Sequence, residues 1–482
     1  MMNGGVCASN TIPSPVSRST SPANVSLHAV EELCLLSDTN VGSIDGEHDL
    51  ITAPVMTRHA YVMAGLEEER SQYGVLGSVL AIQENADRMV PEDPRLYVNT
   101  NAPFSAVVCG VQGSGKSHTV SVLLENMLIP EYSPIGVCKK TLCGLVLHFG
   151  EGGPSSRPNE AAWISQTTMS DVQVPSVHVY VSSSSLHTMK AVYAPLGPNV
   201  KVLPLLFSDS ELDAEAFLSM MAVGSSDSAP LYMQTVLSIL RKLGETFTYT
   251  AFTREMDSCK VDFNPAQLAG LKQRLALLEA FIDQHNKYPP SRFCEGQLTI
   301  IDLSDPFIDP AAACSLFEIA TRIFVRADVG TGKVLVVDEA HKYLAANKGN
   351  SGLTRALLSL IRQQRHLAMR VVLSTQGKAN SRASCASRFM QCRYIAQVLS
   401  PSWWEHIVKH VSAKLSDDAF DQVVKLRAGE SIILAPAGFG VFSGSNGSGQ
   451  QELCQFGRRF ILAKTRKRVT ADGGASILVM DG

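Results

Sequence analysis

A glycine-rich segment of the chain carries the residue types that bind phosphate. It runs from Gly110 to Ser117 and matches the pattern Gly-x-x-x-x-Gly-Lys-Ser. In such a segment, backbone N–H groups and a helix N-terminus face a polyphosphate, the lysine reaches the β- and γ-phosphates, and the hydroxyl binds Mg²⁺. The sequence therefore predicts a site for ATP and Mg²⁺, formed by Gly110, Gln112, Gly113, Ser114, Gly115, Lys116, Ser117 and His118.

The surroundings of this segment are those that the motif requires. An apolar run at 104–109 precedes it, and a helical pattern begins at Ser117 and ends near Pro130. A second glycine-lysine turn, from Gly330 to Lys333, lacks the hydroxyl residue after its lysine and leads into a strand. We interpret this second turn as a flexible connection without a role in phosphate binding.

An acidic pair far downstream complements the glycine-rich segment. Asp338 and Glu339 follow the apolar run 334–337, which places both carboxylates at the end of a buried strand. Asp338 can hold Mg²⁺ through its water shell, and Glu339 can polarise the attacking water. Gln376 ends another apolar run and can hydrogen-bond the γ-phosphate or that water. The sequence thus predicts nucleotide hydrolysis.

Basic residues between the acidic pair and Gln376 suggest a further catalytic group. Residues 353–370 fit a helix whose arginines lie outside its apolar stripe. Arg365, or Arg362 in its place, is the predicted finger that stabilises transition-state charge on the γ-phosphate of a neighbouring subunit. A solvated helix face is the alternative explanation for these arginines.

Strand and helix patterns alternate along the chain and predict the elements that position these residues. Such alternation is typical of an α/β fold with a mostly parallel sheet covered on both faces. Because ligands bind beyond the carboxyl ends of parallel strands, the residues after Cys109, Val337 and Thr375 should meet. The candidate strands are 104–109, 143–149, 176–182, 298–302, 333–337, 371–375, 392–398 and 431–435.

The predicted domain organisation has three parts. Residues 1–50 have the Ser- and Pro-rich character of a disordered tail, and residues 51–95 form a short N-terminal segment. Residues 96–482 are predicted to form one ATPase domain around the glycine-rich segment from Gly110 to Ser117, which is a P-loop. The long stretch between Lys116 and Asp338 carries apolar residues at helical spacing, which predicts a helical insertion at about 208–292.

Composition limits the possible classes of protein. The 482 residues are 45% hydrophobic and 18% charged, which is globular composition with an ample core. A formal net charge of −3 gives no general attraction to nucleic acid. The 11 cysteines include no C-x-x-C spacing, which argues against a disulfide framework and a zinc ribbon. No apolar run suits a membrane span or a signal peptide, so we expect a soluble intracellular protein, nuclear or cytoplasmic.

Several polar and aromatic residues have structural explanations. Asp302 and Asp305 follow a strand and have either a functional role or a role in capping the helix predicted at 311–325, of which capping is favoured. Trp403 and Trp404 are assigned to packing. A basic cluster near the end of the chain can contact nucleic-acid phosphate, serve in nuclear import or form a solvated strand pair. This cluster consists of Arg458, Arg459, Lys464, Arg466, Lys467 and Arg468.

The order of these motifs resembles that of HerA/FtsK-type DNA-pumping ATPases, particularly the HerA branch. The resemblance covers about residues 96–470 and rests on the P-loop, the acidic pair and the Ser-Thr-Gln376 strand. It implies a RecA-like core, a homo-oligomeric hexameric ring, ATP bound between subunits and duplex DNA in a central channel. HerA proteins begin with a small β-barrel that docks a nuclease. Residues 28–95 carry too few alternating strands to show it, so no nuclease partner is expected.

Two other functions remain open from the sequence. A non-translocating NTPase switch or scaffold would use the same nucleotide site to control assembly with a protein partner, and the missing β-barrel and the modest net charge favour it. A superfamily-2 DEAH-type helicase would account for the tetrad from Asp338 to His341. That class needs a second RecA-like domain, for which too few residues follow Gln376.

Overall fold

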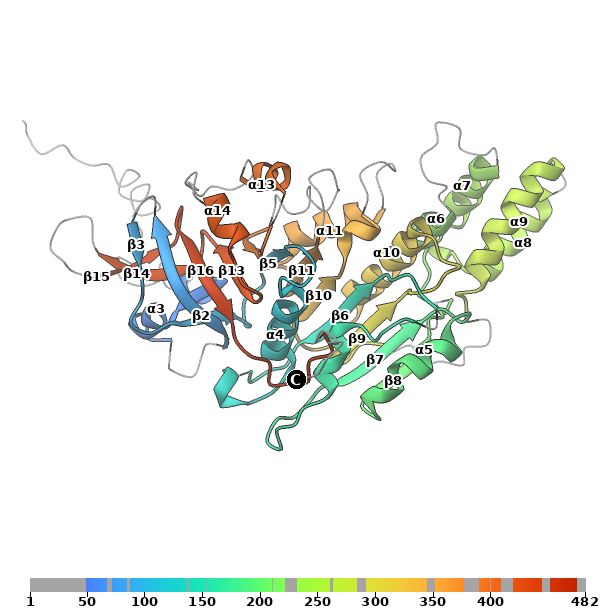
Figure 1. Cartoon of the computed structure of the whole chain (residues 1–482). Helices are drawn as coiled ribbons and strands as arrows, with labels where there is room; N and C mark the ends of the chain where they lie inside the picture. The colour runs from blue at the N-terminus through green and yellow to red at the C-terminus, as the bar shows by residue number, and fades with distance from the viewer. Residues whose placement is uncertain are drawn as a thin grey trace, which may run out of the picture. The chain divides into compact units, whose positions relative to one another are not determined.

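Figure 1 shows the computed structural model of the chain. We describe residues 49–66, 72–84, 87–136, 138–153, 155–209, 211–221, 232–260, 263–283, 292–344, 352–376, 390–398, 400–408, 419–443 and 451–474. Most of the predicted tail, residues 1–48, lies outside them. The described residues from Asp49 onward belong to one compact unit.

A single large sheet runs through the described residues. One part of it is parallel, and its strands lead to the predicted functional residues. In sheet order these strands are β12 (Cys392–Ile395), β5 (Ser105–Cys109), β11 (Met369–Thr375), β10 (Lys333–Val337), β6 (Cys143–His148), β9 (Gln297–Asp302), β7 (Ser176–Val181) and β8 (Val200–Pro204).

The rest of the sheet is mostly antiparallel and combines both ends of the described chain. The N-terminal strand β2 pairs with the C-terminal strand β16, seen as blue beside red in Figure 1. From the outer edge to its junction with β12, this part contains β15 (Gln451–Gln455), β14 (Phe439–Ser443), β1 (Val55–Thr57), β4 (Arg95–Asn99), β2 (Tyr73–Glu84), β16 (Phe460–Thr465) and β13 (Glu430–Leu434), and β3 (Asp87–Met89) pairs with β2.

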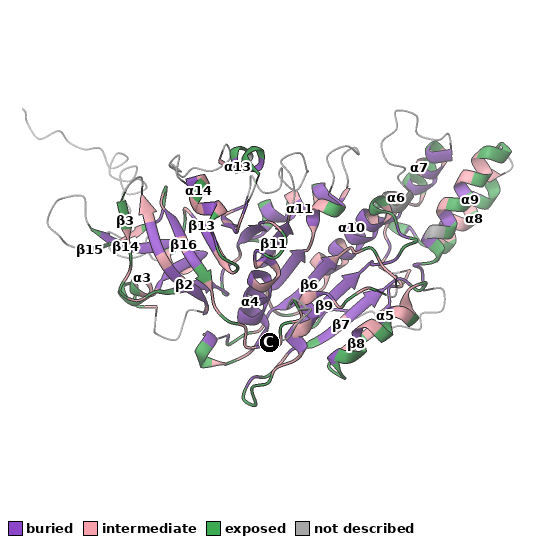
Figure 2. Cartoon of the chain, viewed as in Figure 1, coloured by how far each residue is buried: buried purple, intermediate pink, exposed green. Residues whose placement is uncertain are grey.

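Helices cover both faces of the parallel part, because its strands carry apolar residues on both sides. In β10, Leu335 and Val337 belong to one core, and Val334 and Val336 belong to the core on the other face. The first core includes residues of α10 (Pro310–Arg326), α11 (Gly352–Gln363), α13 (Pro401–Val408) and α14 (Ala419–Val424). The second includes residues of α4 (Lys116–Leu128), α5 (Leu186–Tyr193), η2 (Glu160–Ser165) and η3 (Ala194–Leu196). Figure 2 shows the central strands almost entirely buried.

A group of helices follows β8 and precedes β9, where the sequence predicts an insertion. These helices are α6 (Ala214–Met221), α7 (Tyr232–Leu243), α8 (Tyr249–Cys259) and α9 (Pro265–Glu279), with the short η4 (Gly244–Thr246). Their inner faces extend the first core, and Figure 2 shows exposed outer faces on α8 and α9. The remaining short helices are α3 (Arg58–Met63), η1 (Ser133–Ile135) and η6 (Ala340–Lys342).

The predicted α/β class with a mostly parallel sheet is confirmed. Each of the candidate strands corresponds to a strand, from β5 to β13, and only β13 joins its neighbour β12 antiparallel. Trp403 and Trp404 are buried in the first core, so their assignment to packing is also confirmed.

The description of residues 28–95 as poor in strands is wrong. The segment contains β1, β2 and β3, and the boundary predicted at residue 96 falls within β4. The residues of β2 alternate imperfectly between apolar and small side chains, which hides a long strand from a pattern search. In the structure, strand β2 belongs to the same sheet as β5, the strand that precedes the P-loop.

No described helix is both long enough and apolar enough to cross a bilayer.

Candidate functional site

The glycine-rich loop joins the carboxyl end of β5 to the first turn of α4. Gly113 and Gly115 have φ angles of 77° and 94°, in the left-handed region that glycine adopts without strain. A Cβ atom at Gly115 would lie 2.8 Å from the backbone nitrogen of Gly429, so only glycine allows this close approach. The N–H of Gly429 donates to the carbonyl of Ser114 at 3.2 Å, which holds the loop against the turn before β13.

Lys116 begins α4, and its ammonium turns back into the loop. It donates to the carbonyl of Val111 at 2.8 Å, and the hydroxyl of Ser114 donates to the same oxygen at 2.7 Å. Burial lowers the pKa of Lys116, and the nearby carboxylates of Glu339 and Asp338 oppose that shift. The lysine therefore links the loop electrostatically to the acidic pair.

Asp338 follows β10 and is held by side chains from two other elements. Its Oδ2 atom accepts from Nδ1 of His148 at 3.0 Å and from Nδ2 of Asn159 at 3.1 Å. Burial favours the neutral acid, but the hydrogen bond and charge of His148 and the hydrogen bond from Asn159 outweigh it and lower the pKa of Asp338. The carboxylate is thus fixed in its ionised form.

His148 is the last residue of β6 and lies between two carboxylates. Burial disfavours its charged form, but the hydrogen bond to Asp338 and the charges of Asp302 and Asp338 raise its pKa. Asn159 also accepts from the N–H of Ala161 and so caps η2. The roles of His148 and Asn159 were not predicted from the sequence, because neither residue belongs to a motif and both roles arise from tertiary contacts.

Glu339 and Gln376 contact each other directly. The side-chain amide of Gln376 donates to both carboxylate oxygens of Glu339, at 2.9 and 3.2 Å. Glu339 has a φ angle of 48°, a backbone conformation that costs about 1–3 kcal/mol for residues other than glycine. Nδ1 of His341 accepts from the backbone N–H of Gln376 at 3.3 Å, and its Nε2 lies 3.4 Å from Glu339. Hydrogen bonds therefore join the residues that follow β10 to Gln376, which follows β11.

Lys116, Glu339 and Gln376 line one cavity of about 570 Å³, whereas the predicted metal ligand Asp338 is not among its lining residues. Its first wall consists of predicted residues from the loop, α4 and the two strand ends: Gln112, Gly113, Gly115, Lys116, Ser117, His118, Glu339 and Gln376. Its second wall was not predicted and consists of Glu160, Ala428, Gly429, Lys464, Thr465, Arg466, Lys467, Asp472 and Gly474. Gly110 and Ser114 do not line the cavity, but they support the shape of the loop through contacts within it.

Part of the predicted basic cluster belongs to this second wall. Lys464, Arg466 and Lys467 line the cavity. Arg459 instead lies over the ring of Phe442 and pairs with Glu84 at 2.7 Å. The density of basic residues was the only sequence signal for the second wall, and it gave no indication of a contact with the P-loop helix.

The structure does not bring Arg365 to the cavity of its own chain. The predicted helix 353–370 is wrong at its end, because α11 stops at Gln363 and Arg370 lies buried in β11. Arg365 is exposed in the turn between them. This turn leads to the amino end of β11, whereas the P-loop follows the carboxyl end of the parallel strand β5. Any action of Arg365 on a nucleotide must therefore occur in another copy of the chain.

The assignment of Asp302 and Asp305 to helix capping is also wrong. Asp309 caps α10 by accepting from the N–H groups of Ala311 and Ala312. Asp302 accepts from the hydroxyl of Tyr193 at 2.7 Å. Asp305 accepts from the hydroxyls of Ser182 and Ser184. Asp302 therefore links the end of β9 to α5, and Asp305 links the turn after β9 to the turn after β7. Both roles depend on neighbours distant in sequence.

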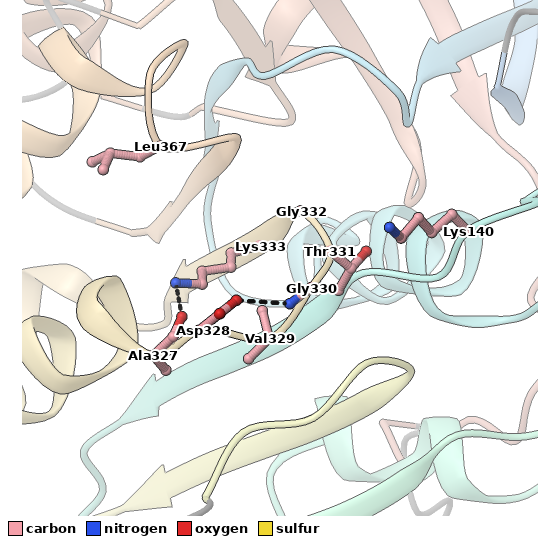
Figure 3. A pocket seen from close by; sticks show the side chains of 9 residues that line it. All are labelled: Lys140, Ala327, Asp328, Val329, Gly330, Thr331, Gly332, Lys333 and Leu367. Atoms are coloured by element: carbon pink, nitrogen blue, oxygen red, sulfur yellow. Dashed lines mark hydrogen bonds between the residues drawn. The ribbon is translucent and has the colours of Figure 1, made fainter.

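The second glycine-lysine turn lies at the opposite edge of the sheet, beside a shallower cavity of about 380 Å³ (Figure 3). Its lysine, Lys333, begins β10 and points toward the end of α10. The ammonium donates to the carbonyls of Val325 and Ala327 at 2.8 and 2.5 Å. The lysine thus satisfies carbonyls that the helix C-terminus leaves unpaired.

Magnesium is compatible with the residues present. In the described parts of the chain, no group of three or more His, Cys, Asp or Glu side chains is placed to hold a metal ion. A nucleotide-bound Mg²⁺ does not need such a group, because phosphate oxygens and waters fill most of its coordination sphere. The Ser117 hydroxyl and the ionised Asp338 offer the hard oxygen ligands that it prefers.

Comparisons with known proteins give weak likenesses. No protein-family model matches the chain, and no curated protein matches its sequence. Among solved structures, VirB4 of Thermoanaerobacter pseudethanolicus is 11% identical with a TM-score of 0.43, over 83% of this chain and 98% of that one. The DNA-packaging ATPase B204 from Sulfolobus Turreted Icosahedral Virus is 11% identical with a TM-score of 0.30, over 74% and 98%.

A further likeness is to the genome packaging NTPase B204 from Sulfolobus turreted icosahedral virus 2, in complex with ATP-gammaS. It is 10% identical with a TM-score of 0.29, over 73% of this chain and 97% of that one. At such identities and TM-scores these likenesses carry no weight for function. The class follows from the chain itself: a parallel sheet with a P-loop after β5 and an acidic pair after β10 is a P-loop NTPase core.

Proposed function

We propose that this protein is an ATP-hydrolysing motor of the HerA/FtsK kind that moves or remodels duplex DNA as an oligomeric ring. One observation carries the hydrolytic part of the proposal: Lys116, Glu339 and Gln376 line the same cavity. They come from positions far apart in the sequence and follow strands that are neighbours in the sheet. Chance matches to short motifs do not converge in this way.

The residues have complementary roles in hydrolysis. Lys116 and the loop N–H groups hold the β- and γ-phosphates. Ser117 and Asp338 would hold Mg²⁺, which would supply positive charge to neutralise the phosphate oxygens. Glu339 accepts a proton from the water that attacks the γ-phosphorus, as the bond to the β-phosphate oxygen breaks. Gln376 positions Glu339 and is placed to exchange this contact for the γ-phosphate. ADP and phosphate are the products.

The ring is proposed because, among the described residues, Arg466 is the one arginine that lines the cavity, and it is paired with Glu125. Arg365 at the opposite edge of the sheet is available to a neighbouring subunit, where it would act as a finger on the γ-phosphate. Arg362 on α11 is the substitute. Hydrolysis would then alter the subunit interface and pass the change to loops that hold DNA.

A non-translocating NTPase switch is the second candidate. It is favoured by the placement of Lys464, Arg466 and Lys467 at the cavity, which removes part of the predicted basic cluster from a DNA surface. The superfamily-2 helicase is disfavoured, because the described residues form one sheet with one P-loop core.

Steady-state ATPase measurements test the proposal. The wild type and Glu339→Gln are each assayed with and without linear duplex DNA, and the mass of the protein in solution is measured in parallel. The motor predicts hydrolysis by an oligomer that rises several-fold with DNA and is lost in Glu339→Gln, although ATP still binds. ATP turnover that does not change when DNA is added would favour the switch. Absence of nucleotide binding would refute both the motor and the switch.

A further inference from the structure

The chain continues from β16 into an extended segment, residues 466–474, which we call the C-terminal strap. It lies against the P-loop helix α4, where Figure 1 shows it in red beside that helix. The anchor is Glu125 of α4, whose side chain is fully buried. Its carboxylate accepts from the guanidinium of Arg466 at 2.6 Å, from the N–H groups of Val469 and Thr470 at 3.0 Å, and from the Thr470 hydroxyl at 2.6 Å.

Further contacts fix the strap to the first turn of α4. Nε2 of His118 lies 2.8 Å from the carbonyl oxygen of Arg466. A carbonyl only accepts, so we assign the proton of this hydrogen bond to the histidine. The hydroxyls of Thr119 and Thr465 lie 3.1 Å apart. Because these contacts begin two residues after Lys116, the strap is held in register with the phosphate-binding loop.

The strap and the end of β16 bring positive charge to the cavity. Lys464, Arg466 and Lys467 all line it. The charge of Arg466 is balanced by Glu125. Lys464 and Lys467 are exposed, and neither forms an ion pair with a described residue. Their ammonium groups are therefore available to a ligand in the cavity.

The order of strands indicates which end of a nucleotide these lysines face. The P-loop follows β5, and β11 and β10 lie on one side of it, carrying Gln376 and Glu339. Strands β12, β13 and β16 lie on the other side and lead to Lys464 and the strap. The phosphate that is cleaved must lie near Glu339. The opposite end of the nucleotide, its α-phosphate and nucleoside, then faces the strap.

We propose that the end of β16 and the C-terminal strap are part of the nucleotide site, with Lys464 of β16 and Lys467 of the strap binding the α-phosphate end of ATP and ADP. This inference rests on the proposed nucleotide site and adds residues to it. Since ATP and ADP share that end, the lysines contribute equally to the affinity for both. Binding energy shared by substrate, transition state and product changes affinity but leaves kcat unchanged.

The experiment compares Lys464→Ala, Lys467→Ala and the double variant with Arg458→Ala as the matched control. Arg458 belongs to the same basic cluster and is exposed, but it does not line the cavity. Affinities for fluorescent ADP and for a non-hydrolysable ATP analogue are measured by titration, and kcat at saturating ATP. A hydrogen bond to a charged group corresponds to about tenfold in affinity, so we expect about a tenfold loss for each single variant.

In the double variant both affinities should fall by the same factor, with kcat within about twofold of the wild type. Arg458→Ala should bind both nucleotides as the wild type does. Lys467→Glu should lose more affinity than Lys467→Ala, because it places a like charge beside the phosphate. All three positions are on the surface, and a thermal melt verifies that each variant is folded.

Other results would overturn the inference while leaving the proposed function intact. If Lys116→Met loses ADP binding but the double variant keeps wild-type affinity, the strap is a structural segment only. If the double variant keeps its ADP affinity and loses affinity for duplex DNA, the lysines contact DNA instead. If the wild type binds no nucleotide, the proposed function itself fails.

Discussion

The two glycine-lysine turns of this chain lie at opposite edges of one sheet and use the same residue types differently. After β5, the turn opens into α4, and Lys116 stands at the first position of that helix. Before β10, the turn opens into a strand, and Lys333 is the first residue of that strand. Only the first arrangement aims backbone N–H groups and a helix N-terminus at a common point.

The hydrogen bonds of the two lysines show the same difference. The ammonium of Lys333 donates to two carbonyls at the end of α10 and lies 5.7 Å from the ring centroid of Phe324. Lys116 donates to a single carbonyl of its own loop and lies near two carboxylates. A bound phosphate can replace a loop carbonyl at little cost, whereas replacing a helix cap leaves buried carbonyls unpaired.

The largest expected difference between the two turns is in catalysis. Lys116→Met should lower kcat/KM for ATP by about 1,000-fold, because it removes a charged donor from the transferred phosphate. Lys333→Met should leave kcat/KM within about twofold of the wild type at temperatures where it is folded. Steady-state ATPase assays of the two variants, made side by side, check this. Equal losses in both would show that the comparison is mistaken.

The carboxyl edge of the sheet should also be sensitive at Gln376, although this side chain is uncharged. Gln376→Ala removes the amide that holds both oxygens of Glu339. We expect kcat to fall by about 100-fold, as for loss of a preorganised donor, with the affinity for ATP nearly unchanged. Single-turnover hydrolysis and an equilibrium titration separate the two quantities. A fall in affinity with kcat intact would assign Gln376 to binding alone.

A smaller effect is expected at His148, which contacts Asp338 rather than the nucleotide. His148→Ala leaves the carboxylate with Asn159 as its remaining side-chain donor among the hydrogen bonds described. Loss of a group that orients a metal ligand costs about tenfold in metal affinity or activity. The Mg²⁺ concentration that gives half-maximal ATPase activity should rise by that factor. His148→Asn, which can still donate, should recover part of it.

The contrast between the two turns is visible in the sequence, and so is much of the parallel sheet. A hydroxyl residue and a helical pattern follow Lys116, whereas apolar residues at strand spacing follow Lys333. These are local signals, and buried parallel strands are nearly continuous apolar runs. The convergence of Lys116, Glu339 and Gln376 follows from the rule that strand ends meet at one edge.

Features that depend on distant contacts could not be predicted in this way. Glu125 is one polar residue in an apolar helix, and nothing nearby in the sequence shows that residues 466–470 satisfy it. The partners of Asp338 likewise come from β6 and η2. Asp309 caps α10 because it directly precedes Pro310, the first residue of that helix, whereas Asp302 ends β9 and accepts from Tyr193, more than a hundred residues earlier. Local propensity cannot choose among several aspartates in one loop.

The smallest expected effect concerns stability, and it differs between the two turns. Lys333→Met removes the donor to the carbonyls of Val325 and Ala327, which should lower the free energy of unfolding by about 1–2 kcal/mol. Burial lowers the pKa of Lys116, which means that burial disfavours its charged form. Lys116→Met replaces this buried ammonium with an apolar side chain of similar length. We expect unchanged or slightly higher stability, because residues placed for function are often strained or poorly solvated. Urea unfolding without nucleotide compares the two. Equal destabilisation would mean that Lys116 supports the fold as Lys333 does, and that its place in the cavity is structural.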